Sequence, residues 1–172
     1  MLEVGDRAKD FALESPRGRV KLSDAKGQYA VVYFYPRDNT PGCTREAQAF
    51  SKASKALKEL GAIVYGISKD SVDSHRKFAD QCGLTIDLLA DPDLATHKAY
   101  GAYGEKTMYG KKVLGTIRST FIVDPTGKIA RVFPRVKVDG HADAVLECIA
   151  DLQSSGVPKP RSRKASVKSS EK

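Results

Sequence analysis

The stretch Pro36-Arg-Asp-Asn-Thr40-Pro41-Gly42-Cys43-Thr44-Arg45-Glu46 lies where the sequence changes from a strand pattern to a helix pattern. Residues 29–35 before it are β-branched and aromatic, which predicts a buried strand. The residues after it are apolar at helical spacing, at Ala47, Phe50, Ala53, Ala56, Leu57 and Leu60. Cys43 is therefore predicted to lie where a buried strand is followed by the start of a helix.

The start of this helix is a favourable place for a reactive sulfur. Pro41 suits the first helical position, because its missing N–H costs nothing there, and Thr40 is a natural N-cap. The unpaired N–H groups and the helix dipole at such an end favour a thiolate over a thiol. The sequence thus indicates a site built around Cys43.

Length and cysteine content predict one domain in a reducing compartment. A chain of 172 residues buries enough surface to fold without disulfides, and its three cysteines do not form a secreted framework. The N-terminus lacks the basic start and apolar core of a signal peptide, and no apolar run is long enough to span a membrane. We therefore expect a cytoplasmic protein.

The net charge of +8 is concentrated at the C-terminus. Residues 153–172 carry six basic residues and one acidic residue, which leaves +3 on residues 1–152. This segment is rich in Ser and Pro, so we expect a domain at 1–152 and a disordered basic tail at 153–172. The tail is either a solubilising extension or a segment that makes weak, salt-sensitive contacts with nucleic acid.

The remaining pattern alternates strands and helices. Strands are expected at 11–13, 19–22, 31–35, 62–67, 87–90, 120–123 and 129–134, and helices at 44–60, 71–81, 93–99 and 142–152. Ser71 is expected to cap the second helix and Gly83 to end it. This order predicts an α/β fold, with a mixed sheet between helices and a β-hairpin at the N-terminus.

The segment around Cys43 resembles the active-site signature of the peroxiredoxins, which reads here as Pro36, Thr40 and Cys43. Residues 99–124, which contain Arg118-Ser-Thr-Phe-Ile-Val-Asp124, resemble the Q-type peroxiredoxins, also called bacterioferritin-comigratory proteins. The resemblance covers residues 4–152. It implies a thioredoxin-like fold and a thiol-dependent peroxidase that reduces hydrogen peroxide and organic hydroperoxides without a metal or cofactor.

The resemblance also implies roles for individual residues. Cys43 attacks the peroxide, the Thr40 hydroxyl binds it, and Arg118 stabilises the thiolate and the transition state. Pro36 shapes the pocket, and Glu46, one turn after Cys43, is expected to orient Arg118 by a bidentate pair. The product, a cysteine sulfenic acid, is returned to the thiol through a disulfide. Thioredoxin or a similar dithiol reduces that disulfide, and the family pattern favours a monomer.

The second cysteine of this cycle is not settled by the sequence. The commonest family pattern has a cysteine five residues after the first, where this chain has Gln48. Cys82 lies at the C-terminal end of the second predicted helix, just before Gly83, and a few residues after the position used by one family variant, near Phe78 or Ala79. It is either the resolving cysteine or a small packing residue. Cys148 lies on an apolar helix face and is expected to be buried and inert.

Two other functions remain open. If Cys82 only packs, the protein is a one-cysteine peroxidase that an external thiol reduces directly. The other alternative is a non-catalytic redox sensor that the basic tail places on nucleic acid. A dithiol oxidoreductase is disfavoured, because Glu46 stands where the second cysteine of a Cys-x-x-Cys motif would be.

The other polar residues are expected to have structural roles. His75, His97 and His141 are not at metal-ligand spacing and are expected at the surface. The pair Asp38-Asn39 and the segment Asp91-Pro-Asp93 are typical of turns and caps. Glycines 101, 104, 110 and 115 predict a loop over the site, and Tyr103, Met108 and Tyr109 either form its apolar rim or pack under it.

Overall fold

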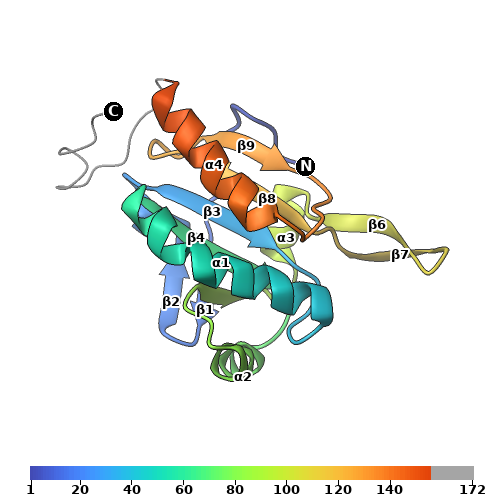
Figure 1. Cartoon of the computed structure of the whole chain (residues 1–172). Helices are drawn as coiled ribbons and strands as arrows, with labels where there is room; N and C mark the ends of the chain where they lie inside the picture. The colour runs from blue at the N-terminus through green and yellow to red at the C-terminus, as the bar shows by residue number, and fades with distance from the viewer. Residues whose placement is uncertain (156–172) are drawn as a thin grey trace.

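The computed structural model describes residues 1–155 as one mixed sheet covered by helices on both faces, with a two-stranded hairpin that extends from the body (Figure 1). Seven strands form the main sheet in the order β2-β1-β5-β4-β3-β8-β9. Their bounds are β1 Ala12–Ser15, β2 Gly18–Lys21, β3 Tyr29–Phe34, β4 Ala62–Ser68, β5 Asp87–Ala90, β8 Ser119–Val123 and β9 Ile129–Phe133. The predicted α/β class and the N-terminal hairpin, formed by β1 and β2, are confirmed.

Strand β3 is the centre of the sheet and leads directly to Cys43. All six of its residues are buried, because side chains on both of its faces are covered. It pairs in parallel with β4 and antiparallel with β8, from Ala30 opposite Val123 to Phe34 opposite Ser119. The carboxyl end of β3 and the beginning of β8 therefore lie side by side. This register places Arg118, just before β8, next to the turn that carries Cys43.

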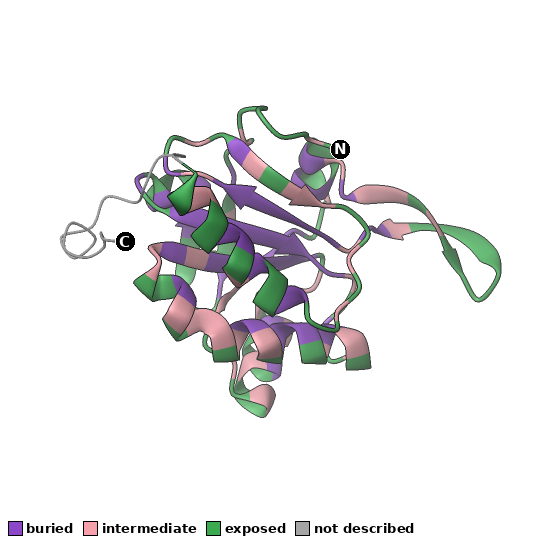
Figure 2. Cartoon of the chain, turned by 45° about the horizontal axis from the view of Figure 1, so that its top comes forward, coloured by how far each residue is buried: buried purple, intermediate pink, exposed green. Residues whose placement is uncertain are grey.

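Three helices cover one face of the sheet. They are α1 (Pro41–Glu59), α2 (Val72–Cys82) and α4 (His141–Ser154), which share one hydrophobic cluster with side chains of β3 and β4. The opposite face is covered by the N-terminal residues, a short 3₁₀ helix η1 (Leu22–Ala25) and α3 (Ala95–Tyr100). Buried side chains thus lie on both faces of the central strands, whose residues are coloured as buried in Figure 2. Among the described residues, no helix is long and apolar enough to cross a membrane.

Most expected boundaries are close to the observed ones, and two differ in ways that matter. Helix α1 begins at Pro41 after Thr40, as these two residues predicted, and therefore three residues before Thr44, where the expected range began, so Cys43 lies inside its first turn. Helix α4 continues to Ser154, two residues past the expected end of the domain. Residues 156–172 of the expected basic tail lie outside the described residues. Ser71 caps α2 by accepting from the N–H of Ser74, and Gly83 ends α2 in the left-handed conformation, as predicted.

The expectation of a glycine-rich loop at residues 101–115 was wrong. The segment forms a regular hairpin of β6 (Tyr103–Met108) and β7 (Lys111–Thr116), joined by Tyr109 and Gly110. Both turn residues have positive φ, 53° and 77°, which is typical of the two-residue turns that fit the twist of a hairpin. The glycines Gly104 and Gly115 face each other across this hairpin and weaken its strand signal in the sequence.

Candidate active site

Cys43 is buried in the first turn of α1, with only 1% of its surface exposed. The first N–H to bond within the helix is that of Thr44, which donates to the carbonyl of Thr40 at 2.8 Å. The N–H groups of Gly42 and Cys43 come before this bond, so they belong to the part of the turn that the helix itself leaves without acceptors. The sulfur therefore lies beside donors and the positive end of a 19-residue helix.

Arg118 connects the sulfur with a carboxylate. Its Nη2 lies 3.3 Å from Sγ of Cys43, and its Nη1 donates to Oε1 of Glu46 at 2.6 Å. The guanidinium also lies close to the backbone of Gly42, where a Cβ would come within 3.4 Å of Nη2. Burial alone would lower the pKa of Arg118, but the adjacent Glu46 and Cys43 outweigh it and raise that pKa. Arg118 is thus a cation fixed on the sulfur.

Glu46 holds Arg118 with one oxygen only, so the expected bidentate pair is wrong. The two guanidinium nitrogens divide between Glu46 and Cys43 because both acceptors lie on the same side of α1. The second oxygen of Glu46, Oε2, is buried without a hydrogen-bond partner. Burial raises the pKa of Glu46 to about 7, although Arg118 pulls it down. The Tyr33 hydroxyl, whose pKa burial and the negative charge of Glu46 also raise, is likewise buried without a partner.

Thr40 and Pro36 lie on the turn between β3 and α1, as expected. Thr40 is the N-cap residue by position, but its hydroxyl makes no capping bond and instead donates to the carbonyl of Arg37 at 3.0 Å. Because the hydroxyl hydrogen is used, its oxygen is left to accept a hydrogen bond. Pro36 lies two residues after the end of β3 and is half-buried.

Asp38 and His75 form a buried polar network behind this turn, which sequence reasoning missed. The Asp38 carboxylate accepts from the Tyr35 hydroxyl at 2.6 Å and from the Ser74 hydroxyl at 2.7 Å, and it meets Nδ1 of His75 at 2.7 Å. Nε2 of His75 faces the carbonyl oxygen of Leu89 at 3.0 Å. The network joins the Cys43 turn, α2 and β5 in the interior of the protein.

The prediction of three surface histidines was wrong. His75 and His97 are fully buried, and His141 is only 6% exposed. His97 pairs with Asp91 at 2.7 Å, in a second histidine–aspartate pair away from the Cys43 turn. A signal was present, because each of the first two lies three residues before a buried aromatic on the same helix, Phe78 and Tyr100.

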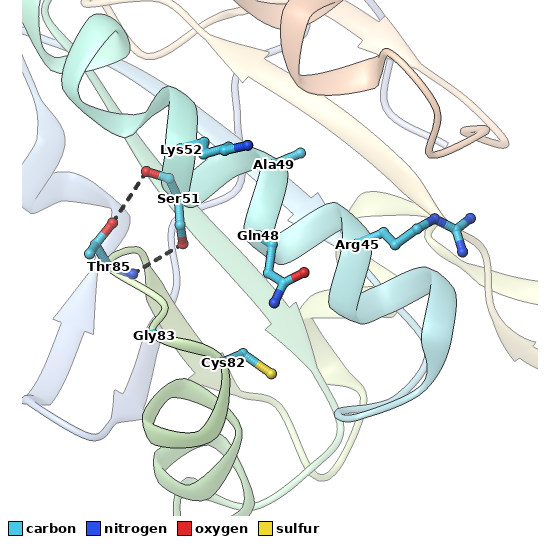
Figure 3. A pocket seen from close by; sticks show the side chains of 8 residues that line it. All are labelled: Arg45, Gln48, Ala49, Ser51, Lys52, Cys82, Gly83 and Thr85. Atoms are coloured by element: carbon cyan, nitrogen blue, oxygen red, sulfur yellow. Dashed lines mark hydrogen bonds between the residues drawn. The ribbon is translucent and has the colours of Figure 1, made fainter.

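Cys82 is the last residue of α2 and lies in a groove between α1 and α2 (Figure 3). The groove has a volume of about 610 Å³, and its other lining residues are Arg45, Gln48, Ala49, Ser51, Lys52, Gly83 and Thr85. Cys82 is partly exposed and is packed at the margin of the main hydrophobic cluster. The side chain of Cys82 points into this groove, and the side chain of Gln48 on α1 points into the same groove (Figure 3).

The segments that carry Cys43 and Cys82 are in contact. Asn39, in the turn before α1, donates from its side-chain amide to Oε1 of Gln81 at 3.2 Å. Gln81 is the neighbour of Cys82, and this hydrogen bond is exposed. Asn39 also has a positive φ of 64°, so the chain turns sharply just before Thr40. All three cysteines are free thiols in the described residues.

Cys148 behaves as predicted. It is 5% exposed on the inner face of α4, and burial raises the pKa of its thiol. It therefore packs as a small apolar side chain in the main cluster.

Comparisons with known proteins agree with this geometry. The model of the AhpC/TSA family matches residues 4–132. A putative peroxiredoxin bcp of Helicobacter pylori is 46% identical over 149 residues, which are 86% of this chain and 98% of that protein. Peroxiredoxin Bcp of Bacillus subtilis is 39% identical over 152 residues, which are 88% of this chain and 97% of that protein.

Solved structures show the same fold. A bacterioferritin comigratory protein of Xanthomonas campestris, described for its alkyl peroxide reduction activity, has a TM-score of 0.80 and 39% identity, over 88% of this chain and 97% of that one. A PrxQ mutant of Xylella fastidiosa has a TM-score of 0.84 and 37% identity, over 89% of this chain and 98% of that one. The fold is thus thioredoxin-like, and the chain belongs to the AhpC/TSA family, as a peroxiredoxin of the Q type.

Proposed function

We propose that this thiol-dependent peroxidase reduces hydrogen peroxide and organic hydroperoxides at Cys43, with Arg118 as its main electrostatic partner. The observation that carries the assignment is the 3.3 Å distance between Nη2 of Arg118 and Sγ of Cys43, at the start of α1. A cation fixed on a buried sulfur at a helix N-terminus favours the thiolate, which is the nucleophilic form.

In the first step, the Cys43 thiolate attacks one oxygen of the hydroperoxide and the O–O bond breaks. The attacked oxygen stays on sulfur as the sulfenic acid, and the other leaves with its substituent as water or an alcohol once it has taken a proton. The Thr40 oxygen is free to accept a hydrogen bond from the peroxide O–H. The N–H groups of Gly42 and Cys43, together with Arg118, would stabilise the charge that develops on the leaving oxygen.

Ionisation of the thiol cannot by itself account for fast peroxide reduction. A lower thiol pKa increases the fraction of thiolate but decreases its nucleophilicity, with a Brønsted slope of about 0.4–0.5 in thiol–disulfide exchange. The two effects largely cancel, so most of the rate must come from orienting the peroxide and stabilising the transition state. The half-buried Pro36 would help by keeping water from the reacting atoms.

The second step in this proposal is attack of Cys82 on the sulfenic acid. The Cys82 thiolate forms the S–S bond and expels the hydroxyl, which takes a proton and leaves as water. Two observations support Cys82, namely its position in the groove beside α1 and the hydrogen bond from Asn39 to Gln81. Cys43 is buried under Arg118 and does not line the groove, so the first turn of α1 or the last turn of α2 must open.

The cycle closes when a dithiol such as thioredoxin reduces the Cys43–Cys82 disulfide. Such reductants belong to reducing compartments, which fits the cytoplasmic location expected from the cysteine content. We propose that the protein acts as a monomer, because both cysteines of the cycle come from one chain. A one-cysteine cycle remains the alternative, and it would leave Cys82 as a packing residue at the margin of the core.

The test combines kinetics with a disulfide map. Cys43→Ser should abolish peroxide reduction, measured by stopped-flow mixing of the reduced protein with hydrogen peroxide, and should leave the fold intact by circular dichroism. Mass spectrometry after one equivalent of peroxide should identify a Cys43–Cys82 bond. Cys148→Ser, which changes a buried thiol away from the site, is the matched control. Substantial turnover by Cys43→Ser would refute the assignment.

A further inference from the structure

The β6–β7 hairpin carries most of the exposed large apolar side chains of the described residues. These exposed side chains are Met1, Val4, Met108, Tyr109, Val113 and Leu114, and four of the six belong to the hairpin. Tyr109 is 98% exposed and Leu114 is 70% exposed. Figure 2 shows the hairpin extending away from the body, with its tip coloured as exposed. Its composition is unusual for a strand pair in which only Thr116, at the base, is buried.

The turn residue itself points to a function outside the fold. Tyr109 has φ 53°, in the left-handed region that hairpin turns usually fill with Asn, Asp or Gly. The local fold would thus be better served by a small residue, and the ring packs on nothing because it is 98% exposed. Tyrosine is among the residues that contribute most to protein interfaces.

The hairpin is joined to the active site at its base. Strand β7 ends at Thr116, two residues before Arg118. The Lys106 ammonium on β6 donates to the carbonyl of Thr116 at 2.8 Å, which fixes the two strands at this end. The hairpin extends beyond the start of α1, where Cys43 lies (Figure 1). Six-residue strands reach about 20 Å from the site to the tip.

A protein reductant is large enough to contact the hairpin tip while its thiol is at the active site. A globular domain of 100 residues has a radius of gyration of about 13 Å, so a domain that places a thiol at the site covers surface as far as the hairpin. A small dithiol would not reach it. The charge of the hairpin also favours a partner with an acidic surface, because Lys111 and Lys112 lie next to the apolar tip and Glu105 is the only acidic residue on the two strands.

We propose that the β6–β7 hairpin is the docking surface for the protein dithiol that reduces this peroxidase, and that the partner has an apolar surface with an acidic rim around its own thiols. The inference rests on the proposed cycle through a Cys43–Cys82 disulfide. One thiolate of the docked partner attacks a sulfur of that bond, and the other sulfur leaves as a thiolate. The second thiolate of the partner then breaks the mixed disulfide, so the partner is oxidised by two electrons and this chain regains both thiols.

The experiment compares a protein reductant with a small one. The Tyr109→Ser/Leu114→Ser double variant should raise the KM for thioredoxin about tenfold or more, the loss expected when interface anchors are removed. Turnover supported by dithiothreitol, and the rate of peroxide consumption by the reduced protein, should match the unmodified protein. Val4→Ser, which changes an exposed apolar residue outside the hairpin, is the control and should leave the thioredoxin KM unchanged.

The contribution of the two lysines beside the hairpin tip is tested separately. Lys111→Glu/Lys112→Glu should weaken the thioredoxin reaction most at low salt, whereas Lys55→Glu, an exposed lysine on α1, should not. An unchanged thioredoxin KM in the double serine variant would overturn the docking surface. The proposal would also be overturned if the double serine variant lost only self-association in gel filtration, or only binding to anionic vesicles, while its reaction with thioredoxin stayed normal. If the unmodified protein did not turn over peroxide with dithiothreitol as the reductant, the peroxidase cycle itself would instead be refuted.

Discussion

The carboxylate of Asp38 and the imidazole of His75 meet at 2.7 Å in the interior, where the side chains are 3% and 0% exposed. Asp38 belongs to the turn between β3 and Cys43, and His75 belongs to α2. The pair therefore fixes the position of the Cys43 turn from behind, against the helix that ends in Cys82. A residue far from the reacting sulfur can in this way influence the geometry of attack.

His75→Asn should both destabilise the protein and slow peroxide reduction. Leaving a buried hydrogen-bonding group without its partner costs roughly 1–3 kcal/mol, and displacement of the turn should reduce the rate constant with peroxide by tenfold or more. His97→Asn is the matched control, because His97 is equally buried and also paired with an aspartate at 2.7 Å, but away from the turn. Stopped-flow rates should be compared well below both melting temperatures. Equal slowing in the two variants would mean that stability alone is responsible.

Arg118→Ala should slow peroxide reduction by roughly two to three decades, which is the scale of losing one preorganised electrostatic donor. The reason is the loss of the group at 3.3 Å from the sulfur, together with an unpaired carboxylate at Glu46. Arg118→Lys keeps the charge but lacks the planar guanidinium that reaches both acceptors. Its rate should therefore lie between those of Arg118→Ala and the wild type. A loss of less than fivefold in Arg118→Ala would place Arg118 outside the reaction.

Glu46 should make the stability of the protein depend on pH around neutrality. Burial raises the pKa of its carboxyl from 4.5 to about 7. Below pH 4.5 the group is protonated in both the native and the unfolded state, so its favourable contribution is fully present. As the pH rises through 7 the buried carboxyl must ionise, and that contribution is lost.

Glu46→Gln removes this ionisation and supplies the comparison. Denaturant unfolding of both proteins, measured from about pH 4.5 to about pH 8, should show the wild type losing stability relative to Glu46→Gln, by up to about 3 kcal/mol. Other carboxyls titrate in both proteins and cancel in the difference. A difference that stays constant with pH would mean that Arg118 keeps Glu46 ionised throughout.

The position of Cys43 follows from local sequence, whereas Arg118 was predicted at the site only from the resemblance to a family. The turn around Cys43 is set by Pro41, Thr40 and the apolar residues on either side, all within a few positions. Arg118 directly precedes a strongly β-branched strand, and the register of β8 on β3 then brings it to the turn. The resemblance to a family supplied their roles.

The Asp38–His75 pair and the β6–β7 hairpin could not be obtained in the same way. The pair joins residues 37 positions apart, and nothing near Asp38 distinguishes a turn carboxylate from a buried one. The hairpin has a glycine in each strand and exposed residues on both faces, so it lacks the alternation that identifies a half-buried strand. In both cases the decisive contacts are tertiary or external, and hydrophobic periodicity does not record them.

The last prediction concerns Cys82 and separates the two cycles. A Cys43–Cys82 bond would close 39 positions of sequence, a loop for which chain entropy gives roughly 4 kcal/mol of unfolded-state restriction. Its α-carbons must come within about 7 Å, which requires at least one helix end to unwind. The last turn of α2 is the easier one, because Gly83 ends it and the Asn39–Gln81 hydrogen bond that holds it is exposed.

Cys82→Ser should therefore stop after the first step. The reduced variant should consume one equivalent of peroxide at the wild-type rate, because Cys43 and Arg118 are untouched. Its sulfenic acid should then persist, react with a sulfenic-acid trap and overoxidise with excess peroxide, and thioredoxin should not sustain turnover. Cys148→Ser, the control with a buried thiol, should cycle normally. Wild-type turnover of Cys82→Ser with thioredoxin would instead establish the one-cysteine mechanism and leave Cys82 as a packing residue.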